Sequence, residues 1–200
     1  MSEMSGKMVS FDIEIKGVTS LLQHRFGEAA EASVESETRT IRVARGTPRE
    51  EAEKVCYRDK NGYLWHPGAA IARGLREVGS GHKQRGSRKS LKYIIPAAVL
   101  VMDDAVGIFD DEGQRIKDYE VDSRPVVIPA TKGRVMRHRP RLDVWRMRFT
   151  LRINTTLMDE DTVHLLLDQM GQQNGVGDFR PEKGGPFGTF VVTKWEARKN

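Results

Sequence analysis

The sequence predicts an α+β fold, and three stretches of the chain carry that prediction. Residues 9–16 alternate apolar with polar or charged side chains at a period of two, which is typical of a strand with one solvent-facing side. Residues 144–153 alternate in the same way, with arginine at most of the even positions. Residues 159–170 instead repeat their apolar side chains at the helical period, and Gly171 follows. Strands and helices therefore follow one another along the chain.

Shorter elements fill the chain between these three. Asn61-Gly62 predicts the tight turn of a β-hairpin over residues 55–65, because it supplies the positive φ that such turns need. The other expected elements are a helix over 69–78, a buried strand over 93–102, short extended pieces at 108–109 and 125–129, and a last strand over 190–195. Without insertions, the order is β-α-β-β-α-β, the ferredoxin-like (RRM-like) core.

Length and composition predict a single domain over residues 1–200. A chain of 200 residues with 38% hydrophobic side chains can bury one core. Residues 27–54 are rich in Glu, Ala, Ser, Thr and Arg without a clear apolar period, so we expect an exposed insertion there. Residues 80–92 hold five basic and no acidic side chains, which predicts an exposed basic loop.

The sequence indicates a cytoplasmic protein without a membrane segment. The longest nearly unbroken apolar stretch, residues 94–102, is far shorter than the ~20 residues that cross a bilayer. The first residues do not resemble a secretory signal. Cys56, the single cysteine, has no disulfide partner within the chain and is expected to be a packed strand residue.

The net charge of +5 is concentrated in a few segments. Residues 132–148 contain seven Lys or Arg and one acid, Asp143, so this run carries a local charge of +6. A run this basic is hard to neutralise within itself and favours phosphate binding. The expected nucleic-acid contacts are Lys132, Arg134, Arg137, Arg139 and Arg141 in this run, Lys83, Arg85, Arg88 and Lys89 in the basic loop, and Arg25, Arg73 and Arg76 elsewhere.

Residues 175–188 form a glycine-rich segment with five glycines between a helix and a strand. Glycines let backbone amides approach a phosphate closely, while Arg180 and Lys183 add charge and Phe179 adds a stacking surface. The segment lacks the Gly-Lys-Ser/Thr of a P-loop, and it precedes a strand where a Rossmann fingerprint would open a helix. A tight crossover without a ligand is the alternative interpretation.

Residues 63–76, which read Tyr-Leu-Trp-His-Pro-Gly-Ala-Ala-Ile-Ala-Arg-Gly-Leu-Arg, resemble a motif of the RAMP superfamily, the RNA-binding proteins of CRISPR effector complexes. The resemblance extends to the glycine-rich loop and to the element order, and it covers roughly residues 9–17, 63–78 and 142–195. Ala69-Ala70 replaces the hydroxyl pair often found in the motif. The chain also resembles small phage-encoded proteins. The resemblance implies a backbone-type subunit that holds single-stranded nucleic acid along a basic groove and stacks on copies of itself.

We therefore expect a non-enzymatic protein that binds single-stranded nucleic acid, RNA in preference to DNA, as a homo-oligomer along the strand. Two alternatives stay open. One is a metal-independent ribonuclease in which His24, placed where some RAMP ribonucleases carry an active-site histidine, takes the proton of a ribose 2′-hydroxyl. The other is a viral assembly or host-interaction protein. The histidine spacing indicates no metal site, and no cofactor is expected.

Overall fold

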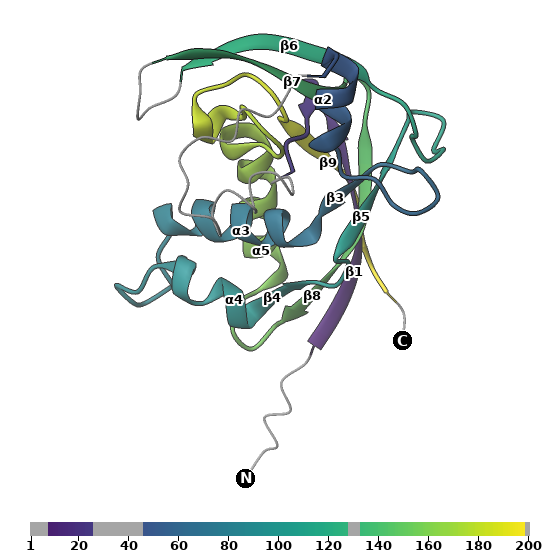
Figure 1. Cartoon of the computed structure of the whole chain (residues 1–200). Coiled ribbons are helices and arrows are strands. Elements are labelled where there is room, and N and C mark those ends of the chain that lie inside the picture. Colours follow the sequence, from purple (N-terminus) through teal and green to yellow (C-terminus); the bar gives the residue numbers. More distant parts are fainter. Residues whose placement is uncertain (1–7, 26–45, 128–132, 199–200) are drawn as a thin grey trace, which may run out of the picture.

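The computed structural model is built on an antiparallel sheet whose strands lie in the order β3-β5-β8-β1-β9, with β4 also paired to β8 (Figure 1). The structure describes residues 8–25, 46–127 and 133–198. The strands of this sheet are β1 (Met8–Gly17), β3 (Trp65–Pro67), β4 (Val99–Val101), β5 (Ala105–Phe109), β8 (Arg146–Asn154) and β9 (Phe190–Ala197). All their pairings are antiparallel, so the predicted α+β class is confirmed.

Helices cover one face of this sheet (Figure 1). They are α3 (Gly68–Val78), α4 (Ile95–Ala98) and α5 (Glu160–Gln169), and single turns lie at η1 (Gly79–Gly81), η2 (Leu91–Tyr93), η3 (Met170–Asn174) and η4 (Pro181–Lys183). The alternation in β1 and β8 explains the arrangement, since every second residue of both strands is apolar and buried in the core. Asp159 caps α5 by accepting a hydrogen bond from the backbone N–H of Thr162.

A second, smaller sheet lies beyond the end of the first and has the order β2-β7-β6. Its strands are β2 (Leu21–Leu22), β6 (Glu120–Val127) and β7 (Arg134–Leu142). The β6–β7 ribbon arches over the top of the molecule, and α2 (Pro48–Lys54) packs beneath it (Figure 1). Most of the insertion expected at 27–54 lies outside the described residues. Its last part forms α2, which starts with a capping box between Thr47 and Glu50 and buries Ala52.

Several sequence-based elements are confirmed and two are corrected. The helix expected over 69–78, the strand over 144–153 and the helix over 159–170 correspond to α3, β8 and α5. The buried strand expected over 93–102 is wrong for its first part, where a turn and α4 precede β4. Pro96 sits in the first turn of α4, where its missing N–H costs nothing. The fragment at 125–129 is part of the longer strand β6, and β7 was not anticipated.

Among the residues that the structure describes, no helix is long and apolar enough to cross a membrane.

Candidate functional site

Three segments that are distant in the sequence, together with Tyr57 from a fourth, surround a cavity of about 310 Å³. One side is formed by the residues after β2, including His24. Another side is formed by the junction of β3 with α3, from His66 to Gly74. The third is the start of the glycine-rich loop, from Gly175 to Arg180. Two motifs selected from the sequence, the strand–Pro-Gly–helix motif and the glycine-rich loop, thus meet at one site.

His66 lies at the wall of this cavity and is only 3% exposed. Neither of its ring nitrogens has a hydrogen-bond partner among the described residues. Burial, and secondarily the charge of Arg180, lower the pKa of His66 to about 4, so the ring is neutral at neutral pH. A neutral imidazole with one unused N–H donor and one unused acceptor therefore lies in the wall of the site.

His24 also lines the cavity and is engaged by Arg137. Its Nε2 lies 2.8 Å from Nη1 of Arg137, and the guanidinium can only donate, so Nε2 is the acceptor. Desolvation lowers the pKa of His24, with Asp178 opposing this effect and the nearby arginines adding to it. The lone pair that a general base needs is occupied by Arg137 in this arrangement.

Gln23 holds the hairpin against the end of β2. Its side chain is buried, and Oε1 accepts a hydrogen bond from the backbone N–H of Tyr57 at 3.0 Å, while Nε2 donates to the carbonyl oxygen of Trp65 at 2.8 Å. The thiol of Cys56 lies 3.6 Å from the same Oε1, and burial raises its pKa to about 12. No local sequence pattern marks Gln23, because its role depends on contacts across more than 30 residues.

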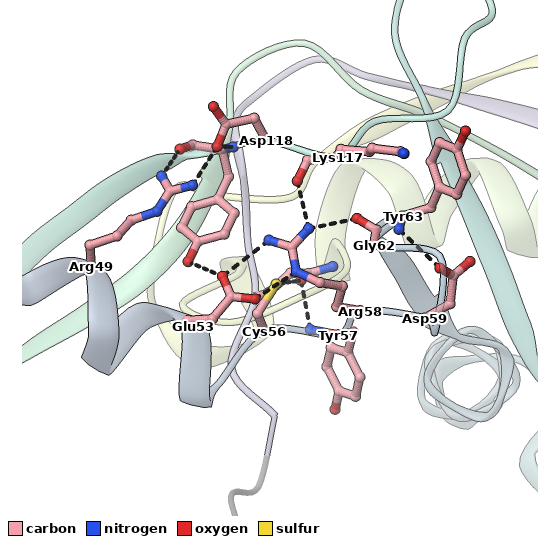
Figure 2. Close-up of polar contacts among 12 residues, drawn as sticks. Arg49, Glu53, Cys56, Tyr57, Arg58, Asp59, Gly62, Tyr63, Lys117 and Asp118 are labelled. Carbon is pink, nitrogen blue, oxygen red and sulfur yellow. Dashed lines mark hydrogen bonds and ion pairs between the residues drawn. The ribbon is translucent and has the colours of Figure 1, made fainter.

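A polar network fastens the hairpin to α2 and to the start of β6 (Figure 2). Glu53 accepts hydrogen bonds from Nε of Arg58 at 2.6 Å and from the hydroxyl of Tyr119 at 2.7 Å. Arg49 stacks over the ring of Tyr119 with 3.9 Å between the guanidinium carbon and the ring centroid, and it pairs with Asp118. The network fixes the start of β6 relative to α2 and the hairpin.

The glycine-rich loop is held in a conformation that only glycine tolerates at its closest approaches. Gly177 has a φ of +78°, and a Cβ atom there would lie 2.4 Å from the carbonyl oxygen of Leu22. Gly188 has a φ of +73°, and its Cβ would lie 1.8 Å from the carbonyl oxygen of Val176. Arg180 stabilises the loop, because its Nη1 donates a hydrogen bond to the carbonyl oxygen of Gly177 at 2.9 Å.

The structure divides the basic residues selected from the sequence into two groups. The first group is exposed and forms no ion pair within the described part of the chain; it comprises Arg25, Arg73, Arg76, Lys83, Arg85, Arg88, Lys89 and Arg134. The second group has internal partners: Arg137 with His24, Arg139 with Asp178, Arg141 with Asp143, and Arg180 and Lys183 with Glu182. Lys132 lies outside the described residues.

Arg139 differs most from the expectation for a phosphate contact. It is 4% exposed, and its Nε lies 2.8 Å from a carboxylate oxygen of Asp178. Asp122, also buried, lies near its other side. This guanidinium is neutralised within the fold, so it is not available to a ligand. Phe179 is partly exposed, has a φ of +48°, and packs against Phe187 with 6.0 Å between the ring centroids.

The helix-free face of the large sheet is charged but internally paired. Glu14 on β1 accepts from Nη1 of Arg146 at 2.8 Å and from Nε of Arg148 at 2.7 Å, both on β8. Glu14 has a lowered pKa: burial acts in the opposite direction, and hydrogen bonds led by that of Arg148 overcome it. Two cations of the basic run at 132–148 are therefore used inside the molecule, and this face offers few free charges.

Comparison with solved structures finds a similar fold in another protein. A chain of the cryo-EM structure of the Type III-B Cmr-beta complex bound to cognate target RNA aligns with a TM-score of 0.50 at 12% identity, over 96% of this chain and 61% of that chain. The alignment shows that the two chains share an overall fold. Our chain thus spans about three fifths of that neighbour.

Two further solved structures align with this chain. Cmr6 from Pyrococcus furiosus aligns with a TM-score of 0.48 at 10% identity, over 92% of this chain and 98% of that one. A chain of a Type IV-B CRISPR complex aligns with a TM-score of 0.47 at 12% identity, over 96% and 91% of the two chains. No protein-family model and no curated protein matches the chain.

Proposed function

We propose that the protein binds single-stranded nucleic acid, RNA in preference to DNA, across the mouth of the cavity, in the manner of a RAMP subunit. The observation that carries this proposal is a group of four arginines around the cavity: Arg73 lines it, Arg76 lies one turn further on α3, Arg25 follows His24, and Arg137 contacts His24. Three of the four have no ion-pair partner in the described part of the chain.

The glycine-rich loop supports the same site. The backbone N–H groups of Gly177 and Phe179 donate to no acceptor within the described residues, so they are free to donate to a ligand. The amide between them, that of Asp178, donates to the carbonyl oxygen of Leu22, so the two free donors lie on either side of a bonded one in a loop with positive φ angles. Phosphate oxygens of a nucleic-acid backbone are acceptors that suit both these amides and the arginines.

We also propose that the core is ferredoxin-like. The sheet order β9-β1-β8-β4, with α3 before β4 and α5 between β8 and β9, supports this assignment. We further propose that copies of the protein assemble as a homo-oligomer along the nucleic-acid strand. Within the described residues β9 pairs on one side only, so its other edge is open to pairing with another chain. Size measurement with and without nuclease treatment tests the assembly, because a strand-dependent oligomer dissociates when its nucleic acid is digested.

The binding experiment is fluorescence anisotropy with a labelled single strand of about 20 nucleotides at several salt concentrations. Each phosphate contact contributes about −0.7 to the slope of log affinity against log salt for single strands, so four arginines predict a slope near about −3. Parallel titrations with RNA, DNA and duplex competitors rank the preferences. Absence of binding at low salt, or a slope near zero, would contradict the proposal.

The ribonuclease alternative depends on His24, and its arrangement favours nucleic-acid contact over proton transfer. Arg137 donates an N–H to Nε2 of His24, and this hydrogen bond uses the lone pair with which the ring would accept a proton. We therefore propose a non-enzymatic role. Incubation of RNA with the protein in a chelator tests this directly, because cleavage that disappears in His24→Ala would support the ribonuclease instead.

A further inference from the structure

The unexplained feature of the site is the missing partner of His66. Buried side-chain nitrogens in folded proteins almost always have a hydrogen-bond partner, and each exception calls for an explanation. Both ring nitrogens of His66 are shielded from bulk solvent and unpaired among the described residues. The partner therefore has to come from inside the fold or from the cavity that the ring lines.

The chemistry around His66 narrows the class of ligand. A neutral imidazole presents one donor and one acceptor, which matches a group that itself carries both, and suits a phosphate or carboxylate less well because these offer acceptors only. Of the two arginines that line the cavity, Arg180 is already bonded to Glu182 and to the carbonyl oxygen of Gly177, and Arg73 is exposed. Among the described residues, no cluster of His, Cys, Asp and Glu is able to hold a metal ion.

The remaining walls suit a flat ring. Tyr57, Pro67, Ala70 and Val176 line the cavity with ring or aliphatic surface, and Gly74 adds no side chain. A volume of about 310 Å³ lies at the lower end of small-ligand pockets, which start near 300 Å³, so it has room for one such group. The edges of nucleobases combine donors and acceptors on a planar ring.

We propose that this cavity is a subsite for a single nucleobase of the bound strand, with its polar edge hydrogen-bonded to His66 and its phosphate held at the rim by Arg73. This inference rests on the proposed binding of single-stranded nucleic acid. The nucleobase subsite would add a base-dependent contribution to the binding affinity, whereas the other proposed contacts are to the sugar-phosphate backbone of the nucleic acid.

Comparison of two strands of equal length, an RNA and a strand in which every nucleoside is replaced by abasic ribose, isolates this contribution. His66→Phe keeps a buried ring but removes the donor and acceptor, and we expect it to weaken RNA binding about 10-fold while leaving affinity for the abasic strand unchanged. His66→Gln, which again carries a donor and an acceptor, should recover part of the loss. His164→Phe is the matched control: His164 stacks on Trp195 with 4.5 Å between the ring centroids and does not line the cavity, so both affinities should stay at the wild-type level.

The outcomes separate the two proposals. If His66→Phe binds RNA as tightly as wild type, or loses affinity for both strands equally, the nucleobase subsite is refuted while backbone binding stands. If the wild-type protein binds neither strand, both proposals fail. Should His66→Phe not fold, the ¹⁵N resonances of the His66 ring in the wild-type protein decide the question: they should shift when RNA is added and stay in place with the abasic strand. Resonances that move with neither strand, or equally with both, overturn the subsite.

Discussion

The double variant Arg73→Gln/Arg76→Gln gives the sharpest test of where the strand binds. Both side chains project from α3, are exposed, and have no ion-pair partner within the described residues. A phosphate contact contributes about 0.7 to the salt slope on single strands, which at about 0.1 M salt corresponds to a factor of about 5 in affinity. Loss of two contacts therefore predicts an affinity about 25-fold lower and a slope smaller by about 1.4.

The matched control is Arg146→Gln/Arg148→Gln, which removes the same number of charges from the other side of the sheet. Both arginines are paired with Glu14, which is largely shielded from solvent. We expect less than about a 3-fold change in affinity, because these cations are already neutralised. The free energy of unfolding should instead fall by about 1–3 kcal/mol, since the carboxylate of Glu14 loses its hydrogen-bond partners.

Anisotropy titrations over a series of salt concentrations measure both quantities, and urea denaturation measures stability. The reasoning is refuted if both double variants lose the same affinity, because binding would then follow total charge and not the position of the free arginines. It is also refuted if the α3 variant weakens binding without changing the salt slope, since the lost contacts would not be to phosphates.

Three further predictions concern stability. Gln23→Leu leaves a buried backbone N–H without its acceptor and should lower the free energy of unfolding by about 1–3 kcal/mol in urea denaturation, whereas an unchanged midpoint would show that the hairpin does not depend on this side chain. Gly177→Ala should destabilise more than Gly184→Ala by thermal denaturation: both positions have positive φ, but only the first places a Cβ against backbone, and equal losses would refute the clash. Glu53 has a pKa lowered chiefly by its hydrogen bond with Arg58, so its contribution is present above its ordinary pKa of 4.5 and is lost as the pH falls through the lowered value. The difference in unfolding free energy between wild type and Glu53→Gln should hence be constant from about pH 7 to 5 and shrink as the pH falls below 4.5, and a difference that does not change with pH would contradict the pairing.

The elements that were predictable from the sequence are those whose burial follows a single period. In β8, apolar residues are buried at every second position from Met147 to Ile153, with Arg148, Thr150 and Arg152 between them, and in α5 the apolar residues recur at helical spacing. β7 shows no such period, because Arg139 and Pro140 are buried next to each other. Its pairing with β6 also leaves no pattern in the sequence of β7 itself. Pro96 similarly converts an apolar run into a helical turn before β4.

The charge pattern of the sequence was the weakest guide to the binding residues, because the acids that neutralise a basic run can lie far away in the sequence. The run at 132–148 holds one acid, yet Glu14 neutralises Arg146 and Arg148 from more than 130 residues away, and Asp178 neutralises Arg139. Of the eight basic residues that were selected from the sequence and form no ion pair within the described part of the chain, six lie in α3 and the loop that follows it. A count along the chain identified basic segments correctly, but only the fold separates the free cations from those already paired.

The motif over 63–76 is best understood through close packing. A Cβ on Gly68 would lie 1.9 Å from the carbonyl oxygen of Asp103, and one on Gly74 would lie 2.3 Å from Cε of Met170. Glycine at these two positions lets α3 approach both the strand connection before β5 and the turn η3, from which the glycine-rich loop emerges. Because the loop follows η3 directly, this approach is what brings Gly177 next to the start of α3 and closes the cavity. The two glycines in the motif thus act on the site from a distance, by fixing the separation between the helix and the loop that form its walls.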